Sequence, residues 1–538
     1  MSLSRSLSRS SRSLASLLTL TSLALVAGCT LGTPGADASD PSATAEPAPT
    51  EGGAVAANDR TDTAKSGEKL LTGDMIVSPA GGYAVLQRNS VSIVVDAAQG
   101  TARELPFQVD RFVFASGFAT GYAINPANAV VAFDLATLQV LWSTSLPTSD
   151  VALFRVAPDD RALVVALGDR VVALDTATGL VRGSVNVTTR PTYLAFAGSS
   201  RAIVVGSTRW TDHHPATSLT SIDLAGSAAP ATAPSIDVPN CEAPLTMLPD
   251  GTRGFLSPTY CEETVPANVQ KTWTNPDPVS VVDNGAAGLS FVKNLPGFGP
   301  VALNGRADKV IAYLDAKRID PAMFDDKSQI PGSDADPYHL LAIDPHTLKL
   351  SLYPIGQELP RFAMSIDGRG LLVDASVHVF RAEAKASIQI GPDGIEASAS
   401  GVFGSDAPFG YFDFDAGKFT AFEGPQVGLD RFVQTADGHV YALKTRTDGL
   451  GGDLFGVDVA QHTTTDLGLS LRDIGVLADR RTLLLRIRLP AANVNGQLYT
   501  QEQVCFSLDG RNCTSTIQYT STIPLPGGQA SCVGGHDC

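Results

Sequence analysis

Charged residues and chemical motifs are both scarce in this sequence. Charged side chains make up only 17% of the 538 residues, and acids outnumber bases, so the formal net charge is -16. An acidic surface repels the phosphates of nucleic acids and of anionic lipids, so we expect no nucleic-acid partner and no membrane binding through charge. The chain is nevertheless 43% hydrophobic, which is typical of a folded domain and excludes disorder throughout.

The motifs that usually mark an active site are missing. The sequence has no G-x-S-x-G nucleophile elbow, no phosphate-binding Gly-Lys-Ser/Thr loop, no H-E-x-x-H zinc motif and no complete EF-hand loop. It also lacks long stretches with the period of an amphipathic helix, which argues against α/β folds and helical solenoids. We therefore predict no catalytic residue, no metal ligand and no cofactor, and we expect an all-β fold.

The N-terminus has the three parts of an export signal. Three arginines stand among the first twelve residues, and Leu14–Ala27 is apolar but short for a membrane span. Small residues then precede Cys29, and this pattern resembles the bacterial lipobox. The resemblance implies cleavage after Gly28 and a diacylglycerol on the Cys29 thiol, which would anchor the chain stably. Losing residues 1–28 removes the three arginines and no acid, so the net charge of the mature chain becomes -19.

Thr30, rather than an aspartate, follows the cysteine, and in a cell with two membranes this resembles sorting to the outer membrane. Residues 29–67 contain mostly Ala, Pro, Thr, Ser, Gly and Asp. Such a segment cannot bury enough apolar surface to offset the entropy of ordering. We predict a signal peptide at 1–28, a disordered linker at 29–67, and a lipid-anchored location in the cell envelope, on the periplasmic or the exposed side of the outer membrane.

Six cysteines remain after Cys29, an even number that favours disulfides in an exported protein. Proximity favours the pairs Cys241–Cys261, Cys505–Cys513 and Cys532–Cys538, although six cysteines allow fifteen pairings. The first two pairs each flank a turn, as facing strands of a hairpin would. A thiolate metal site is the alternative, but the spacings typical of zinc ligands are absent.

One unit recurs from residue 70 onward. It begins with a turn rich in Gly, Asp or Pro, continues with a short strand such as Ala162–Val165, and then has an apolar strand that ends in Asp, such as Val172–Asp175. Asp-containing turns supply side-chain hydrogen bonds to the backbone, and Val, Ile and Phe favour strands. The terminal aspartates of successive units are Asp96, Asp134, Asp175, Asp223, Asp283, Asp344, Asp413, Asp458 and Asp509.

Steps of 38 to 69 residues separate these aspartates, which leaves room for about four short strands in each unit and indicates β-propeller blades. From about Lys69 to Pro524 the units resemble the WD40-like and quinoprotein-like propeller repeats of bacteria. The resemblance implies one propeller at 68–524 with about eight blades, within a range of seven to nine, followed by a Cys-containing tail at 525–538. A set of β-sandwiches is the alternative fold.

Two details of the propeller are also predicted. The 69-residue step between Asp344 and Asp413 is long enough to hold a degenerate blade. Propellers commonly close their ring by pairing a terminal strand with the blade from the other end of the chain. Here the segments for that pairing are Ser515–Thr522 and Leu70–Met75.

Insertions at Thr211–Ser218, Glu262–Pro276 and Ala316–Pro337 carry most candidate ligand-binding residues. His213 and His214 are adjacent, so on an extended chain they point to opposite sides and are better explained as part of a polar loop. An acidic group offers oxygen ligands that suit Ca²⁺, although a solvated loop is preferred. That group consists of Asp325, Asp326, Asp334, Asp336 and His339.

The remaining histidines have no companion close in sequence; they are His346, His378, His439 and His462. Trp142, Trp210 and Trp273 are interpreted first as blade packing. Trp210 and Trp273 lie at or within insertions, with Tyr260 nearby, and the alternative is that aromatic residues on such loops stack on a sugar or grip a peptide.

These observations favour a non-enzymatic binding or scaffold propeller, anchored by lipid, that recognises a protein or glycan partner through loops on one face of the ring. The alternative is a propeller enzyme, either a quinone-dependent dehydrogenase or a metal-dependent, lactonase-like hydrolase. Its acidic and histidine side chains would gather around the central channel from distant parts of the chain, where no local motif would reveal them.

Overall fold

The computed structural model describes residues 67–524 except for 68, 71–73, 79–81, 89–90, 116–119, 212–213, 225–233, 259–277, 318, 332–337, 357–360, 366–367, 375–386, 392–393, 399–408, 426, 428–430, 446–451, 478–480 and 495–496. The signal peptide, Cys29, the linker before Gly67 and the C-terminal tail lie outside the described residues, so these assignments stay predictions.

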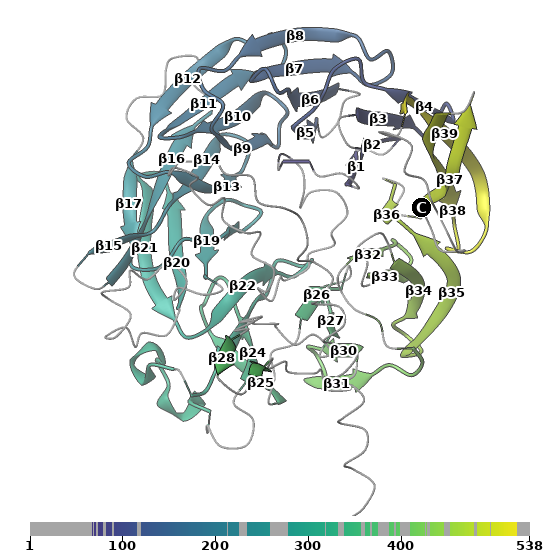
Figure 1. Cartoon of the computed structure of the whole chain (residues 1–538). Coiled ribbons are helices and arrows are strands. Elements are labelled where there is room, and N and C mark those ends of the chain that lie inside the picture. Colours follow the sequence, from purple (N-terminus) through teal and green to yellow (C-terminus); the bar gives the residue numbers. More distant parts are fainter. Residues whose placement is uncertain are drawn as a thin grey trace, which may run out of the picture. The chain divides into compact units, whose positions relative to one another are not determined.

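Nine antiparallel sheets of four or five strands follow one another along the described part of the chain. Each sheet is built from one contiguous segment and adds its strands from an inner strand outwards (Figure 1). In most pairs of neighbouring sheets the inner strands contact one another, and the first inner strand, β1, also contacts the last, β36. The fold is therefore a nine-bladed β-propeller. This confirms the all-β prediction and lies at the upper end of the predicted range, one blade above the favoured eight.

The first three blades have four strands each. Blade 1 contains β1 (Met75–Val77), β2 (Tyr83–Arg88), β3 (Val91–Asp96) and β4 (Thr101–Glu104). Blade 2 contains β5 (Arg111–Phe114), β6 (Thr120–Ile124), β7 (Ala129–Asp134) and β8 (Val140–Ser145). Blade 3 contains β9 (Val151–Val156), β10 (Ala162–Leu167), β11 (Arg170–Asp175) and β12 (Val181–Asn186).

Blade 4 adds a short extra strand. It contains β13 (Pro191–Ala197), β14 (Arg201–Gly206), β15 (Arg209–Thr211), β16 (His214–Asp223) and β17 (Ser235–Val238). Blade 5 contains β18 (Leu245–Met247), β19 (Arg253–Leu256), β20 (Val279–Gly285) and β21 (Gly288–Leu295). Blade 6 contains β22 (Phe298–Leu303), β23 (Val310–Asp315), β24 (Tyr338–Ile343) and β25 (Leu350–Gly356).

The last three blades complete the ring. Blade 7 contains β26 (Arg361–Met364), β27 (Gly370–Asp374), β30 (Phe409–Asp413) and β31 (Lys418–Ala421). Blade 8 contains β32 (Arg431–Gln434), β33 (Val440–Thr445), β34 (Gly452–Asp458) and β35 (Thr463–Leu471). Blade 9 contains β36 (Asp473–Val476), β37 (Leu483–Val494), β38 (Gln497–Ser507) and β39 (Cys513–Pro524).

Helix is rare in the described part of the chain. It consists of two single-turn 3-10 helices, η3 (Pro321–Met323) and η4 (Lys327–Gln329), and Asp320 and Asp326 cap their N-termini. No helix among the described residues has the length and apolar character that a membrane crossing requires.

The core lies between blades, because each inner sheet face packs against the next blade. In blade 3, β10 is buried at every position, so both of its faces are covered by apolar neighbours. A strand buried on both faces reads as a continuous apolar run rather than an alternation. The sequence Ala-Leu-Val-Val-Ala-Leu of β10 has that form, which explains why the second strands of the blades were recognisable.

Among the described residues, the long step before Asp413 adds no further blade to the ring. The structure places a two-stranded hairpin there, β28 (Ser387–Gly391) and β29 (Gly394–Ser398), between the second and third strands of blade 7. The prediction of a degenerate blade is therefore wrong. The apolar residues and glycines of this stretch form a local hairpin, which sequence spacing alone does not distinguish from a reduced blade.

The ring also closes differently from the prediction. β39 pairs with β38 of its own blade, and β1 pairs with β2 of its own blade, so no terminal strand is exchanged. Instead, apolar side chains of blades 1 and 9 form one cluster that includes Val77, Ile93, Leu484 and Phe506. Closure by side-chain packing needs no strand pairing between the two ends.

The topology defines two faces of the ring. Four antiparallel strands return the chain to the side on which it started, and most connections between blades are short, so every inner strand begins on the same side. That side, which also carries the connections between second and third strands, is called the insertion face. The opposite side, which carries the turns after the first and third strands, is called the turn face.

Candidate functional site

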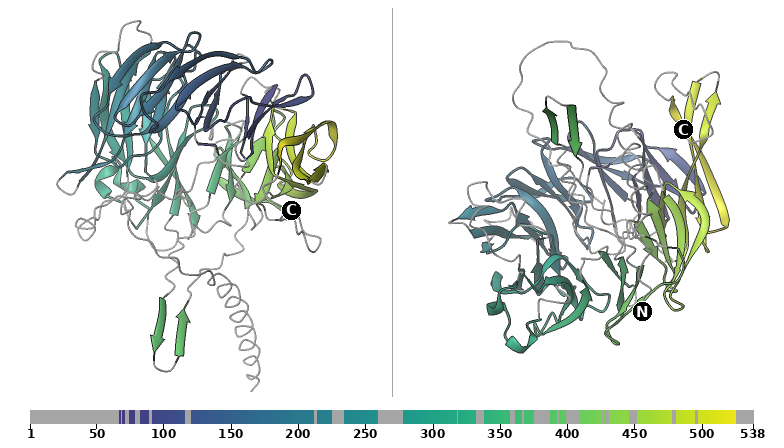
Figure 2. Two further views of the ribbon diagram at one scale, coloured as in Figure 1. Left: turned by 45° about the horizontal axis from the view of Figure 1, so that its top comes forward. Right: turned by 60° about the horizontal axis from the view of Figure 1, so that its bottom comes forward.

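The long insertions gather on the insertion face. They connect the second and third strands of blades 4 to 7 and span residues 207–213, 257–278, 316–337 and 375–408. In blade 9 the same connection is carried beyond the neighbouring blades by the long strands β37 and β38, drawn in yellow (Figure 2). Four adjacent blades and blade 9 therefore extend the same side of the ring, whereas the turn face has one long connection, residues 224–234.

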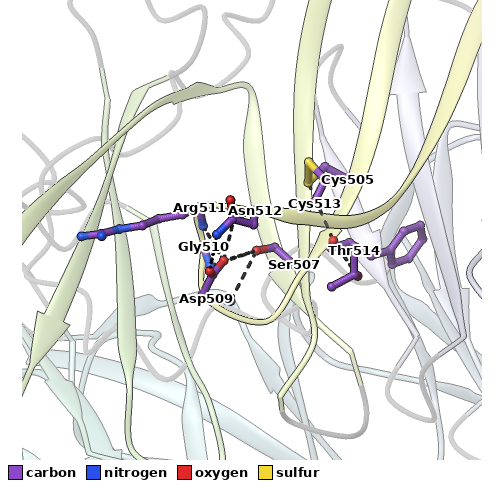
Figure 3. The surroundings of a disulfide bond; sticks show 9 residues. Cys505, Ser507, Asp509, Gly510, Arg511, Asn512, Cys513 and Thr514 are labelled. Carbon is purple, nitrogen blue, oxygen red and sulfur yellow. Dashed lines mark hydrogen bonds between the residues drawn. A yellow bond between two sulfur atoms is a disulfide. The ribbon is translucent and has the colours of Figure 1, made fainter.

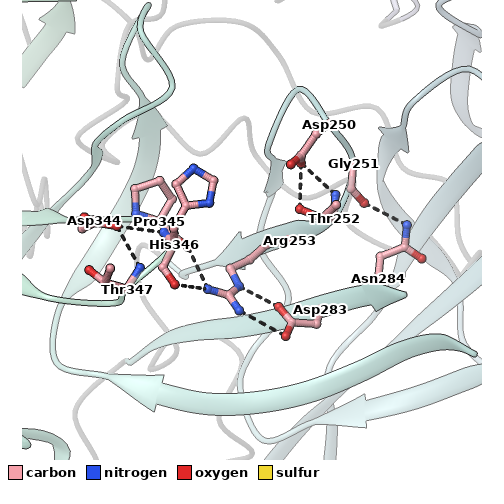
Figure 4. Close-up of polar contacts among 10 residues, drawn as sticks. All are labelled: Asp250, Gly251, Thr252, Arg253, Asp283, Asn284, Asp344, Pro345, His346 and Thr347. Atoms are coloured by element: carbon pink, nitrogen blue, oxygen red, sulfur yellow. Dashed lines mark hydrogen bonds and ion pairs between the residues drawn. The ribbon is translucent and has the colours of Figure 1, made fainter. Parts of the chain in front are cut away.

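The turn face is tied together by aspartate turns. Asp344 Oδ1 accepts hydrogen bonds from the backbone N–H groups of His346 (2.9 Å) and Thr347 (2.8 Å), and these bonds lower the pKa of its carboxyl group, that from Thr347 most of all. Arg253 Nη1 of the neighbouring blade donates to the Pro345 and His346 carbonyls at 2.8 and 3.0 Å (Figure 4). The turns of this face thus hold adjacent blades in place.

Asp283 fixes the Arg253 guanidinium for this contact. Arg253 Nε and Nη2 donate to the two Asp283 carboxylate oxygens at 2.6 and 3.2 Å, and this hydrogen bonding raises the pKa of the guanidinium (Figure 4). A two-pronged pair of this kind restricts the arginine to one orientation. The arrangement explains the recurrent terminal aspartate as a structural element.

On the insertion face, a buried polar joint connects blades 4 and 5. The Asn240 side-chain NH₂ group donates to the Pro278 carbonyl (2.8 Å) and to the Ser280 hydroxyl (2.9 Å), while the Asn240 backbone carbonyl accepts from Thr217 Oγ1 (2.9 Å). Asn240, Thr217 and Ser280 are fully buried or nearly so. Because these buried polar groups are hydrogen-bonded to one another, they hold blades 4 and 5 in one relative position, at the point where the insertions of the two blades begin.

The same joint holds the β15–β16 hairpin. The Thr208 backbone N–H donates to the Glu242 carboxylate, and the Glu242 N–H donates to Thr208 Oγ1 at 2.8 Å. Arg209 of the hairpin also pairs with Asp237 on the outer strand β17. These contacts position the half-buried Trp210, which lies opposite Pro215 on the insertion face.

The other predicted aromatic residues have separate outcomes. Trp142 packs in the cluster between blades 2 and 3, and its Nε1 donates to the Thr176 carbonyl at 2.9 Å, so the blade-packing prediction is confirmed. Trp273 and Tyr260 lie outside the described residues.

Three members of the predicted acidic group are described, and each has its own surroundings. Asp325 is exposed and pairs with Lys293 Nζ at 2.8 Å, and Asp326 caps η4 through the Ser328 N–H at 2.9 Å. His339 is buried within β24, while Asp334 and Asp336 lie outside the described residues. Among the described residues, no three His, Cys, Asp or Glu side chains form a group that could hold a metal ion.

The histidines are likewise scattered. His214 is exposed at the start of β16, His346 lies in the Asp344 turn, His439 lies near Asp437, and His462 stacks on Phe422 at the turn after β34. His213 and His378 lie outside the described residues. The described histidines named here thus occupy different strands or turns.

One predicted disulfide is confirmed. Cys505 in β38 is bonded to Cys513 at the start of β39, across the hairpin that ends blade 9 (Figure 3). Cys241 is buried and disulfide-bonded. Cys261, Cys532 and Cys538 lie outside the described residues, so the Cys241–Cys261 and Cys532–Cys538 pairings stay predictions.

Asp509 organises the turn between these cysteines. Its Oδ1 accepts from the Arg511 and Asn512 backbone N–H groups, both at 2.8 Å, and its Oδ2 accepts from Asn512 Nδ2 at 2.7 Å (Figure 3). These bonds, that from the Asn512 backbone first, hold the pKa of the Asp509 carboxyl far below its usual range. The charged form is therefore favoured by folding.

Asp509→Asn should lower the free energy of unfolding at pH 7 by about 1 kcal/mol, because the amide keeps an acceptor but loses the charge. A carboxyl with a lowered folded-state pKa stabilises the fold above its unfolded pKa of about 3.9, and the effect is lost as the pH falls through the folded-state pKa. The gap between variant and wild type should thus narrow at low pH. Urea unfolding at pH 7, 5, 4 and 3 checks this, and a gap that stays constant or widens contradicts it.

Comparisons with known proteins assign no family. No family model matches the chain, and no curated protein matches it. Similar solved structures include a eukaryotic initiation factor (10% identity, 74% of this chain, 89% of that chain, TM-score 0.47) and a hydrazine synthase from Kuenenia stuttgartiensis (13%, 57%, 93%, 0.34). Another is a functionally unknown protein from Desulfotomaculum acetoxidans (11%, 63%, 91%, 0.34). We assign this protein to the nine-bladed β-propellers from its own sheet topology and not from these similarities.

Proposed function

We propose that this chain is an exported lipoprotein, anchored in the cell envelope through a lipid on Cys29, whose propeller binds a partner through the insertion face. The observation that carries the proposal is the position of the insertions: four adjacent blades and blade 9 all extend one side of the ring. Loops displayed by a rigid scaffold are where proteins commonly place binding residues.

A protein is the partner that these elements fit best. Several described insertion elements are extended strands, namely β15, the β28–β29 hairpin and the ends of β37 and β38. Within the described residues, β15 pairs with β16 and with no other strand. Strand edges of this kind can add a strand from another chain through backbone hydrogen bonds. A glycan partner, which Trp210 could stack against, is the other outcome of the test.

The test compares two loop replacements in the full-length, lipid-anchored chain. Residues 262–276, between β19 and β20, are replaced by a short Gly-Ser linker, and in the matched control residues 225–233 of the turn face are replaced in the same way. We expect partner recovery after cross-linking in cells to fall at least tenfold for the first variant and to stay unchanged for the second.

Recovered material is identified by mass spectrometry for proteins and by glycan analysis, and thermal unfolding verifies that both variants are folded. Equal recovery from the first variant and from wild type would contradict the proposal, as would selective loss in the turn-face control. The channel-enzyme alternative has its own measurement, the metal and quinone content of the purified protein, and Ca²⁺ is measured in the same experiment.

A further inference from the structure

Exposed apolar side chains gather on the outer rim of blades 2 and 3. Val140 and Leu141 begin β8, the outer strand of blade 2, and are 49% and 57% exposed. Leu180 precedes β12, the outer strand of blade 3, and Val181 begins it; they are 69% and 58% exposed. Four of the ten large apolar side chains that are exposed in the described part of the chain therefore belong to two neighbouring outer strands (Figure 1). Apolar residues grouped in this way, unlike single exposed ones, mark interaction surfaces.

Trp142 joins the two outer strands into one surface. Its Nε1 donates to the Thr176 carbonyl at 2.9 Å, and Thr144 Oγ1 donates to the Gly179 carbonyl at 2.7 Å, so β8 is bonded to the turn that leads into β12. Gly179 has φ +71°, and a Cβ atom there would lie 2.4 Å from the Trp142 ring, so the turn packs directly on the indole. Blades 2 and 3 thus form a continuous surface at this rim that is already organised for binding.

A β-bulge explains why two successive residues of β8 are exposed. Ala132 pairs with Trp142 and Phe133 pairs with Val140, so Leu141 has no residue opposite it on β7. A bulge bends its strand and changes the direction of the side chains next to it. It also disfavours the addition of a further strand to the same edge, so we expect a partner to be contacted through side chains.

The exposed residues of 135–145 and 176–181, called here the rim surface, include no charged side chain. Charged residues at its border are engaged within the chain: Arg182 pairs with Asp175 at 3.8 Å, and Arg103 donates to backbone carbonyls in the turn before β8. A contact across a two-fold axis places one surface opposite itself, so charges near the axis would meet charges of the same sign. In a chain with a formal net charge of -16, an uncharged apolar surface therefore lets a second copy approach without this repulsion.

We propose that the rim surface binds a second copy of this chain and forms a two-fold symmetric dimer. Seven residues of 135–145 and four of 176–181 are exposed, fewer than the roughly 20–30 residues on each side of a standard stable interface. The dimer is therefore weak, with a dissociation constant of about 1–100 µM. Its apolar residues lie at the turn-face ends of β8 and β12, so the insertion face of both copies stays accessible. Self-association goes beyond the proposed function and does not depend on it.

Photo-cross-linking of the full-length chain in cells tests the proposal. A photoreactive amino acid replaces either Ser143, an exposed residue of β8, or Leu508, which is 60% exposed in a turn of blade 9 and lies outside the rim surface. Two differently tagged copies are expressed together, so a cross-linked product that carries both tags identifies self-association. We expect the yield of this product to be at least fivefold higher from position 143 than from position 508.

A pair of opposite charges tests whether the same surface of each copy is in contact. Leu141→Glu should lower the cross-link from position 143 at least fivefold, because two like charges would meet, whereas the matched control Leu508→Glu should leave it unchanged. Leu141→Glu in one copy together with Leu141→Lys in the other should restore the product that carries both tags. A contact with lipid or with a different protein would not be restored in this way. Leu141 is exposed, so both variants should unfold at the wild-type temperature.

Equal yields from positions 143 and 508 would overturn the proposal, as would cross-links from position 143 to lipid or to another protein alone. A combination of Leu141→Glu and Leu141→Lys that does not restore the cross-link would overturn it too. The measurement depends on neither a lipid on Cys29 nor a partner at the insertion face. Its failure would therefore leave the proposed function intact, and failure of the loop-replacement test would leave the dimer intact.

Discussion

Replacing Glu502 by alanine should lower the free energy of unfolding by about 3–5 kcal/mol, the largest single-residue effect that we predict. Arg486 is 1% exposed and donates from Nε and Nη2 to the Glu502 carboxylate at 3.0 and 3.1 Å. Without Glu502 the guanidinium would be a buried charge without its carboxylate, which is costly in a medium that water does not reach. Urea unfolding at pH 7 measures the change.

Two variants distinguish the free-energy cost of leaving the Arg486 charge buried without its carboxylate from the smaller cost of breaking an exposed ion pair. Asp150→Ala breaks the exposed Arg190–Asp150 pair, whose side chains are 63% and 50% exposed, and should cost less than about 1 kcal/mol. Arg486→Met combined with Glu502→Leu removes both charges and should recover most of the stability lost in Glu502→Ala. If Glu502→Ala were no more harmful than Asp150→Ala, the buried pair would not be a determinant of stability.

The position of Arg486 explains why the effect concerns the whole ring. The guanidinium also donates to the Asp74 and Gln87 carbonyls of blade 1, at 3.3 and 3.4 Å, more than 390 positions earlier in the chain. Among the described residues no strand is exchanged between the two ends of the propeller, so side-chain contacts such as those of this arginine and the apolar cluster join blade 9 to blade 1. If a terminal strand were exchanged, backbone hydrogen bonds would join blade 9 to blade 1 instead.

The sequence predicts the repeat well because the repeat is locally encoded. The nine terminal aspartates each lie within two residues of the end of the third strand of one blade, so their number matches the blade number. An aspartate turn is formed by hydrogen bonds two or three residues away, as at Asp344 and Asp509, and such short-range bonds leave a readable pattern. Counting these aspartates would have given nine blades.

Features that depend on distant residues could not be predicted in this way. Arg486 follows the apolar run Leu483–Leu485, and this run contains no information about the partner of the guanidinium. The two carbonyls that it reaches belong to blade 1, and the Phe112 carbonyl that Gly67 contacts belongs to blade 2, and spacing along the chain does not reveal which blades meet. The insertions could be recognised individually, whereas their shared face follows from the strand order alone.

Cys513→Ser should lower the free energy of unfolding by about 2–3 kcal/mol, the second largest effect. The Cys505–Cys513 bond closes a loop with a sequence separation of 8, and a cross-link stabilises chiefly by restricting the unfolded chain. Cys513 is exposed, so its replacement breaks the bond and removes little packing. Unfolding in urea under non-reducing conditions measures the loss, and the Cys241 bond stays intact in this variant.

A second variant separates the cross-link from the core. Cys505 is fully buried in the cluster between blades 8 and 9, beside residues such as Ile474 and Leu485. Cys505→Ala combined with Cys513→Ser should therefore be less stable than Cys513→Ser alone by about 1 kcal/mol or more, since the alanine leaves a small cavity. A loss below about 0.5 kcal/mol for Cys513→Ser would contradict the prediction.

The cross-link forms only in an oxidising compartment, so a chain kept in a reducing cytoplasm by deletion of residues 1–28 should be at least as unstable as Cys513→Ser.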